Sequence, residues 1–90
     1  MITIRITSPL RRFTEGKAQV EVPGTTVGQA LASLASTYPA LDGRVLSGDG
    51  QLREFVQVHL GRQDVRKLAG MATPVTAGSV LSISSPFSGG

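Results

Sequence analysis

The hydrophobic period of this chain changes twice, and few small folds accommodate both changes. Residues 2–6 alternate isoleucine with polar side chains, which is the pattern of a β-strand with one buried face. Over residues 27–38 the apolar side chains instead recur at helical spacing and form a stripe. Alternation returns over residues 55–60 and again over 80–84. A short chain can bury this mixture by laying a helix across one face of a sheet, so we expect two layers.

Turn residues separate the strands from one another. Ser8-Pro9 ends the first strand, and a long loop leads to a second strand that should pair with it as an antiparallel hairpin. Three residues of the second strand are expected to face the core: Ala18, Val20 and Val22. Farther along, Gly61–Asp64 is expected to form a turn and Val65–Leu68 a short returning segment.

The helix has clear boundaries in the sequence. Thr26 and Gln29 stand at the spacing of a capping box, in which each residue satisfies a free backbone donor of the other. Pro39 ends the helix, because the residue before a proline is pushed out of the helical region. The chain is therefore predicted to be an α+β protein with a β-grasp arrangement, a mixed sheet of four to five strands with one main helix packed across it. We expect a single domain at residues 1–84 and a flexible tail at residues 85–90.

Composition excludes several classes of function. The 90 residues include no cysteine, so disulfides and thiolate metal sites are excluded. The formal charge is +3, but three phenylalanines, one tyrosine and no tryptophan offer few stacking platforms, and we expect no nucleic-acid partner. No apolar run is long enough to span a bilayer, and the first residues lack the pattern of a signal peptide. We therefore expect a cytoplasmic protein with no membrane partner.

Signatures of catalysis are missing from the sequence as well. It has no phosphate-binding loop and no cluster of metal ligands. Its single histidine, His59, has no cysteine to act with and falls on the outward face of a predicted strand. We expect no catalytic residue, no metal site and no cofactor bound by this chain.

The last six residues form the most distinctive local motif. The sequence reads Ser85-Pro86-Phe87-Ser88-Gly89-Gly90 directly after the last predicted strand. The two glycines have no Cβ atoms, so this backbone can enter a slot too narrow for side chains and present the carboxyl carbon of Gly90 to a partner. Pro86 stiffens the tail by fixing its own φ, and Phe87 is a candidate docking anchor.

Three stretches of the chain carry a resemblance to a known family. They are residues 10–16 in the first loop (LRRFTEG), residues 55–66 (FVQVHLGRQDVR) and residues 77–90. Together with the terminal diglycine they resemble the ubiquitin-like sulfur carriers, the MoaD/ThiS-like proteins, and they are most similar to the cysteine-pathway (CysO-like) subgroup. The family often has asparagine where Gln57 and Gly61 stand, and an acidic residue where Ser79 follows Gly78. These departures concern the identity of the partner.

The resemblance implies a role for the terminal carboxylate. In such carriers an E1-like adenylyltransferase and sulfurtransferase uses ATP and Mg to convert the carboxylate to an acyl-adenylate, and a sulfur donor displaces AMP to give a thiocarboxylate. Carried over to this chain, Gly90 is the site of adenylation and thiocarboxylate formation, while Gly89, Ser88, Phe87 and Pro86 thread into the partner. The resemblance thus implies a carrier that serves as a co-substrate and is not an enzyme.

The resemblance also implies further partners. They are a sulfur-accepting enzyme, cysteine-synthase-like in the most similar subgroup, and a metalloprotease that acts at the C-terminus. The expected docking surface is the outward side of the sheet together with the tail. It has five candidate residues: Phe55, Gln57, His59, Arg62 and Arg66.

Other functions stay open at this point. Within the family, the chain could be the small subunit of molybdopterin synthase, which forms a lasting complex with the large subunit. In another class, it could be a protein modifier whose Gly90 forms an isopeptide bond with a lysine. A plain interaction domain with an inert tail is the remaining alternative.

Overall fold

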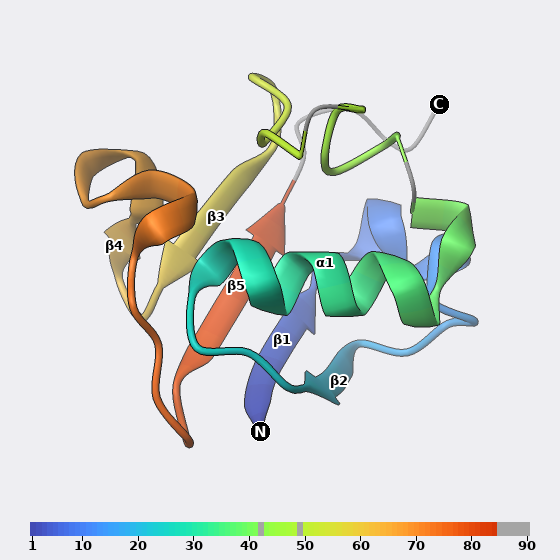
Figure 1. The fold of residues 1–90 in the computed structure, drawn as a ribbon. Helices are drawn as coiled ribbons and strands as arrows, with labels where there is room; N and C mark the ends of the chain where they lie inside the picture. The colour runs from blue at the N-terminus through green and yellow to red at the C-terminus, as the bar shows by residue number, and fades with distance from the viewer. Residues whose placement is uncertain (42, 49, 85–90) are drawn as a thin grey trace.

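The computed structural model describes residues 1–41, 43–48 and 50–84, and it has the two layers expected from the sequence. The α-helix α1 (Val27–Thr37) lies across one face of a mixed sheet (Figure 1). The sheet has five strands, β1 (Ile2–Ile6), β2 (Gln19–Val22), β3 (Gln57–Leu60), β4 (Gln63–Asp64) and β5 (Val80–Ser84). This is the predicted β-grasp fold. The tail expected at 85–90 lies outside the described residues, so the boundary after residue 84 stays a prediction.

The first and last strands of the chain lie side by side in the sheet. The strand order is β2-β1-β5-β3-β4, with β1 and β5 parallel and the other neighbours antiparallel. Ile4 of β1 lies opposite Leu81 of β5, and neither side chain is exposed to solvent. Parallel neighbours require a long crossover, and the segment that contains α1 supplies it.

One core fills the space between the helix and the sheet. The buried face of α1 presents four residues, Val27, Ala30, Leu31 and Leu34. They join the alternate apolar side chains of the strands in a single cluster of buried residues. Each fully buried aliphatic side chain contributes about 1.5–3 kcal/mol, which makes this layer contact the main source of stability. Within the described residues, neither α1 nor the 3₁₀ turns are long and apolar enough to cross a membrane.

The helix begins and ends where the sequence predicts, but its cap differs in one contact. The Thr26 hydroxyl accepts a hydrogen bond from the Gln29 backbone amide at 3.1 Å, as expected for an N-cap. The Gln29 side-chain oxygen accepts from the backbone amide of Thr25 at 2.9 Å and from its hydroxyl at 2.8 Å. The return contact therefore reaches one residue earlier than in the predicted capping box. At the other end, Tyr38 caps the helix just before Pro39.

The first connection is more ordered than a long loop, and one core assignment in it is wrong. A 3₁₀ helix spans Ser8–Phe13, and the buried Thr14 hydroxyl lies 3.2 Å from the Arg11 carbonyl and 2.9 Å from the Lys17 carbonyl. Ala18 was expected to face the core, but it forms a bend before β2 and its side chain is exposed. Because of that bend, Ala18 does not follow the alternation of Val20 and Val22.

The second half of the sheet is shorter than the sequence pattern suggests. β3 begins at Gln57, two residues after the expected start, and Gly61-Arg62 alone makes the tight turn with Gly61 at φ +62°. The returning strand is β4, at Gln63–Asp64, so its assignment to Val65–Leu68 is wrong. The physical reason is Asp64, whose carboxylate accepts from the Arg66 amide at 2.9 Å and caps a 3₁₀ helix at Val65–Lys67.

Arg66 fastens this 3₁₀ helix to the segment before β3. Its guanidinium donates to the Val56 carbonyl at 2.6 Å and to the Arg53 carbonyl at 2.5 Å. Both acceptors lie in the connection that enters β3, and the Val56 side chain is fully buried. Arg66 thus positions the start of β3 from ten or more residues away.

Replacement of this arginine should loosen the start of β3. We expect Arg66→Ala to lower the free energy of unfolding by about 1–2 kcal/mol, because two hydrogen bonds to a charged donor are lost at a partly exposed site. Arg62→Ala is the matched control, since Arg62 is exposed and makes no hydrogen bond within the described residues, and it should change stability by less than about 0.5 kcal/mol. Urea unfolding measures both. Equal stability of the two variants would contradict the anchoring role.

Candidate functional site

The face of the sheet opposite α1 carries the alternate side chains of all five strands. One cross-strand row runs over this outer face from edge to edge, through Gln19, Arg5, Ser82, His59 and Asp64. Residues opposite one another in such a row are near neighbours. The row is polar throughout, whereas the side chains that face α1 are apolar, so this is the solvent-facing side of the sheet.

Three members of this row have the residue types of a hydrolase triad but not its geometry. Ser82, His59 and Asp64 follow one another on β5, β3 and β4. A triad needs hydrogen bonds from serine to histidine and from histidine to the carboxylate, and none joins these three side chains within the described part of the chain. The Asp64 carboxylate instead accepts from the Arg66 amide. Nor do the described residues include a group of three or more side chains that could hold a metal ion.

The last strand ends at a defined place in the sheet, between β1 and β3. Ser84, the last residue of β5, pairs with Gln57 of β3. On the other side, the amide of Thr7 donates to the Ile83 carbonyl at 3.2 Å. Residue 85 therefore follows directly from a position between the end of β1 and the start of β3. The predicted site residues Pro86, Phe87, Ser88, Gly89 and Gly90 lie outside the described residues.

Three of the five candidate docking residues come together beside this point. Gln57, His59 and Arg62 line a pocket of about 460 Å³ on the β3-β4 side of the outer face. Phe55 precedes β3 and its side chain is 39% exposed, and it does not line that pocket. Arg66 differs from the others, because its guanidinium binds two backbone carbonyls. Their roles in docking stay predictions.

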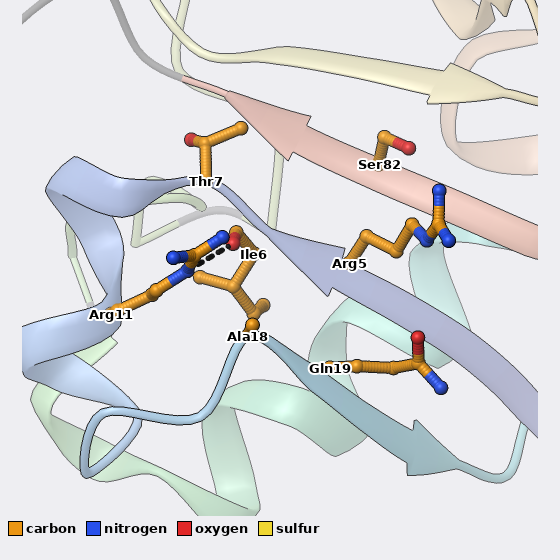
Figure 2. Close-up of a pocket in the computed structure, with 7 residues that line it drawn as sticks. All are labelled: Arg5, Ile6, Thr7, Arg11, Ala18, Gln19 and Ser82. Atoms are coloured by element: carbon orange, nitrogen blue, oxygen red, sulfur yellow. Dashed lines mark hydrogen bonds between the residues drawn. The ribbon is translucent and has the colours of Figure 1, made fainter.

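A second pocket lies on the opposite side of β5, and the sequence analysis missed it. It has a volume of about 400 Å³ and lies over the ends of β1, β2 and β5 (Figure 2). Its lining includes Arg5, Thr7, Arg11, Ala18 and Ser82. The alternation of β1 already placed Arg5 on the outer face, but only the strand register and the course of the first loop bring Arg11 and Ser82 to it.

Thr7 has an unusual position at this second pocket. Its hydroxyl oxygen is buried and has no hydrogen-bond partner within the described residues. A buried hydroxyl without a partner costs free energy, so most such groups are paired. This incompletely bonded group lies at the end of β1, next to the place where β5 ends and the tail begins.

The charges that flank the end of β5 are mostly positive. Arg5 and Arg11 line the second pocket, and Arg62 and Lys67 line the first, where Asp64 is the single acidic lining residue within the described chain. A surface of this sign attracts acidic partners and speeds their association. The outer face beside the end of β5 therefore carries charge of the sign that attracts an acidic partner.

Comparison with known proteins connects this geometry to a family. The model of the ThiS family matches residues 4–90. The sulfur carrier protein CysO of Mycobacterium tuberculosis is 31% identical, over 99% of this chain and 98% of that protein. Small archaeal modifier protein 3 of Haloferax volcanii is 38% identical, over 72% of this chain and 70% of that protein.

Solved structures agree with the sequence matches. The CysO structure from Mycobacterium tuberculosis superposes with a TM-score of 0.86 at 28% identity, covering 97% of this chain and all of that chain. A chain in the crystal structure of the Amycolatopsis orientalis BexX/CysO complex gives a TM-score of 0.89 at 29% identity, with full coverage of both chains. These relatives are small carrier proteins and not enzymes. The chain therefore belongs to the ThiS family, and it is a ubiquitin-like sulfur carrier protein.

Proposed function

We propose that the carboxylate of Gly90 carries the sulfur as a thiocarboxylate. The observation that carries this proposal is that the ThiS family match extends to Gly90. The fold supports it, because β5 ends between β1 and β3 at residue 84, immediately before the tail. A partner that binds this face can draw the two small terminal residues into its own active site.

The chemistry proceeds in two steps on a partner enzyme. A carboxylate is a poor acyl donor, so an E1-like enzyme first uses ATP and Mg to form the acyl-adenylate of Gly90 and release pyrophosphate. Hydrosulfide from a sulfide source then attacks the carbonyl carbon, a C–S bond forms, and AMP leaves together with a proton. The resulting thiocarboxylate is a nucleophile that can pass sulfur to an acceptor. The use of ATP fits a cytoplasmic setting.

The proposed destination of the sulfur is cysteine or a related metabolite. Full-length similarity to CysO supports this choice, and a sulfur-accepting partner of the cysteine-synthase type would then receive the tail. The BexX/CysO complex is a case in which a similar carrier is bound to a second protein. The small subunit of molybdopterin synthase remains the alternative within the family, and stable co-purification with a larger catalytic subunit would favour it.

The mass of the charged protein tests the central step. After incubation with ATP, Mg, an E1-like enzyme and sulfide, the intact protein should gain the mass difference between one sulfur and one oxygen, and fragmentation should place the gain on Gly90. The reason is that the proposed adenylation takes place on the carboxylate of Gly90, which the two glycines allow to enter a narrow active-site slot of the enzyme. A variant truncated after Ser88 is the control and should stay uncharged. A gain of the same mass in the truncated variant, or none in the full chain, would contradict the proposal.

A second function is favoured by one specific observation. Two relatives are named small archaeal modifier proteins, at 38% and 36% identity. We infer that the same activated Gly90 can also react with a lysine amine, which displaces AMP to form an isopeptide bond.

Proteolysis of cellular proteins tests this modifier function. If Gly90 is attached to lysines, a tail engineered for cleavage before Gly89 should leave Gly-Gly remnants on target lysines, which mass spectrometry detects. A strain that carries the chain truncated after Ser88 should yield none. If the full-length strain yields no remnants although its carrier is charged, the modifier function is contradicted and sulfur transfer alone remains.

A further inference from the structure

We propose that the pocket between Arg5 and Arg11 receives a carboxylate side chain from the protein that acts on the tail. The identity of that protein rests on the proposed function, whereas the preference for a carboxylate comes from the pocket itself. The pocket, called here the arginine pocket, is lined by Arg5, Thr7, Arg11, Ala18, Gln19 and Ser82, together with Ile6.

The first argument is that Arg11 is held in place before any ligand binds. Its Nε atom donates to the Ile6 carbonyl at 2.9 Å, and Figure 2 shows the guanidinium lying against that carbonyl at one side of the pocket. The backbone is fixed as well, because the Arg11 carbonyl accepts from the amides of Thr14 at 3.0 Å and Gly16 at 2.8 Å. A donor fixed in this way loses less conformational entropy on binding.

The second argument concerns Arg5, on the other side of the pocket. It belongs to β1, a central strand, and its cross-strand neighbours are the neutral residues Gln19 and Ser82. No acidic residue lines the pocket within the described chain. Arg5 and Arg11 therefore line one shallow space that has no carboxylate of its own among the described residues. Guanidinium groups form their strongest hydrogen bonds with carboxylates.

The shape and lining favour a protein ligand over a nucleic acid. The exposed Ala18 adds apolar surface that suits the methylene groups of an aspartate or glutamate. No aromatic ring lines the pocket within the described residues, so nucleic-acid bases would find no stacking platform there. Phosphate contacts alone give weak, strongly salt-dependent binding.

The position of the pocket indicates which protein would occupy it. Two residues of the arginine pocket lie close to the end of β5. Ser82 belongs to β5 itself, and the amide of Thr7 donates to the Ile83 carbonyl. A protein that also binds the sheet beside the end of β5 can reach this pocket while it acts on residue 90. An acidic residue at the rim of its tail-binding slot would then enter the pocket and fix the orientation of the carrier.

Charge reversal tests the proposal in the charging reaction. With the E1-like enzyme, ATP and sulfide, Arg5→Glu and Arg11→Glu should each raise the carrier concentration for half-maximal charging about 10-fold, because attraction becomes repulsion. Arg12→Glu is the matched control. Arg12 is the next residue of the same 3₁₀ helix, lies over the Phe13 ring at 5.5 Å, and does not line the pocket, so it should change charging by less than about 2-fold.

Thermal unfolding checks that each variant is folded. Arg11→Lys separates the effect of charge from that of the hydrogen bond, because it keeps the positive charge and removes the Nε atom that donates to the Ile6 carbonyl. The lysine variant should stay within about 3-fold of the original chain. Equal charging by the original chain, Arg5→Glu and Arg11→Glu would overturn the proposal, and so would an equal defect in Arg12→Glu, which would point to net charge alone.

A peptide experiment decides the same point without any charging enzyme. An acetylated, amidated peptide with one glutamate between two leucines is titrated into the protein, and its glutamine counterpart is the control. The glutamate peptide should give saturable NMR shifts at the amides of Thr7, Gln19 and Ser82, and Arg11→Glu should abolish them. Shifts of equal size with the glutamine peptide, or none with either, would overturn the carboxylate site. If the original chain is never charged but these shifts appear, the proposed function fails and the carboxylate site stands.

Discussion

The parallel pairing of β1 with β5 is the contact on which the rest of this structure depends. It joins the first strand of the chain to the last, and it places Ile4 beside Leu81 in the centre of the core. Everything between Thr7 and Ser79 is the crossover that this pairing requires, and α1 covers the face where the apolar side chains point. Long-range pairing of this kind has a cost in loop closure, which burial of the shared core offsets.

The same pairing also sets up the outer face. Because side chains alternate along a strand, the register that buries Ile4 and Leu81 places Arg5 next to Ser82 on the opposite side. It likewise brings Thr7 to the end of β5, where the chain passes on toward the tail. In the proposed function, core stability and partner binding thus use different faces of the same two strands. A carrier can change the residues that select its partner while it keeps the core that holds the strands together.

Much of the fold was predictable because it follows from local periodicity. The strands at Ile2–Ile6 and Val80–Ser84 and the helix from Val27 to Thr37 have patterns that only one arrangement buries, and their assignments are confirmed. The errors fall where a bend or a local hydrogen bond overrides the pattern. Ala18 bends away from the core, and Asp64 caps a 3₁₀ turn where a strand was expected.

The candidate site was only partly predictable for a different reason. Gln57, His59 and Arg62 are close in sequence, so a single strand and turn suffice to place them together. The arginine pocket joins residues from both ends of the chain, and alternation along one strand cannot reveal the register between two. Arg66 shows the opposite case, since its charge suggested docking and its hydrogen bonds reveal a structural role as well.

The central claim is that partners bind the outer face around the end of β5 and leave the helix face free. Backbone NMR of the labelled carrier bound to its activating enzyme tests this claim most directly. The account predicts signal changes at Thr7, Gln57 and Ser82, with Ala32 and Ser36 on the exposed side of α1 unaffected. Changes confined to the exposed side of α1, with the outer face unperturbed, would contradict it.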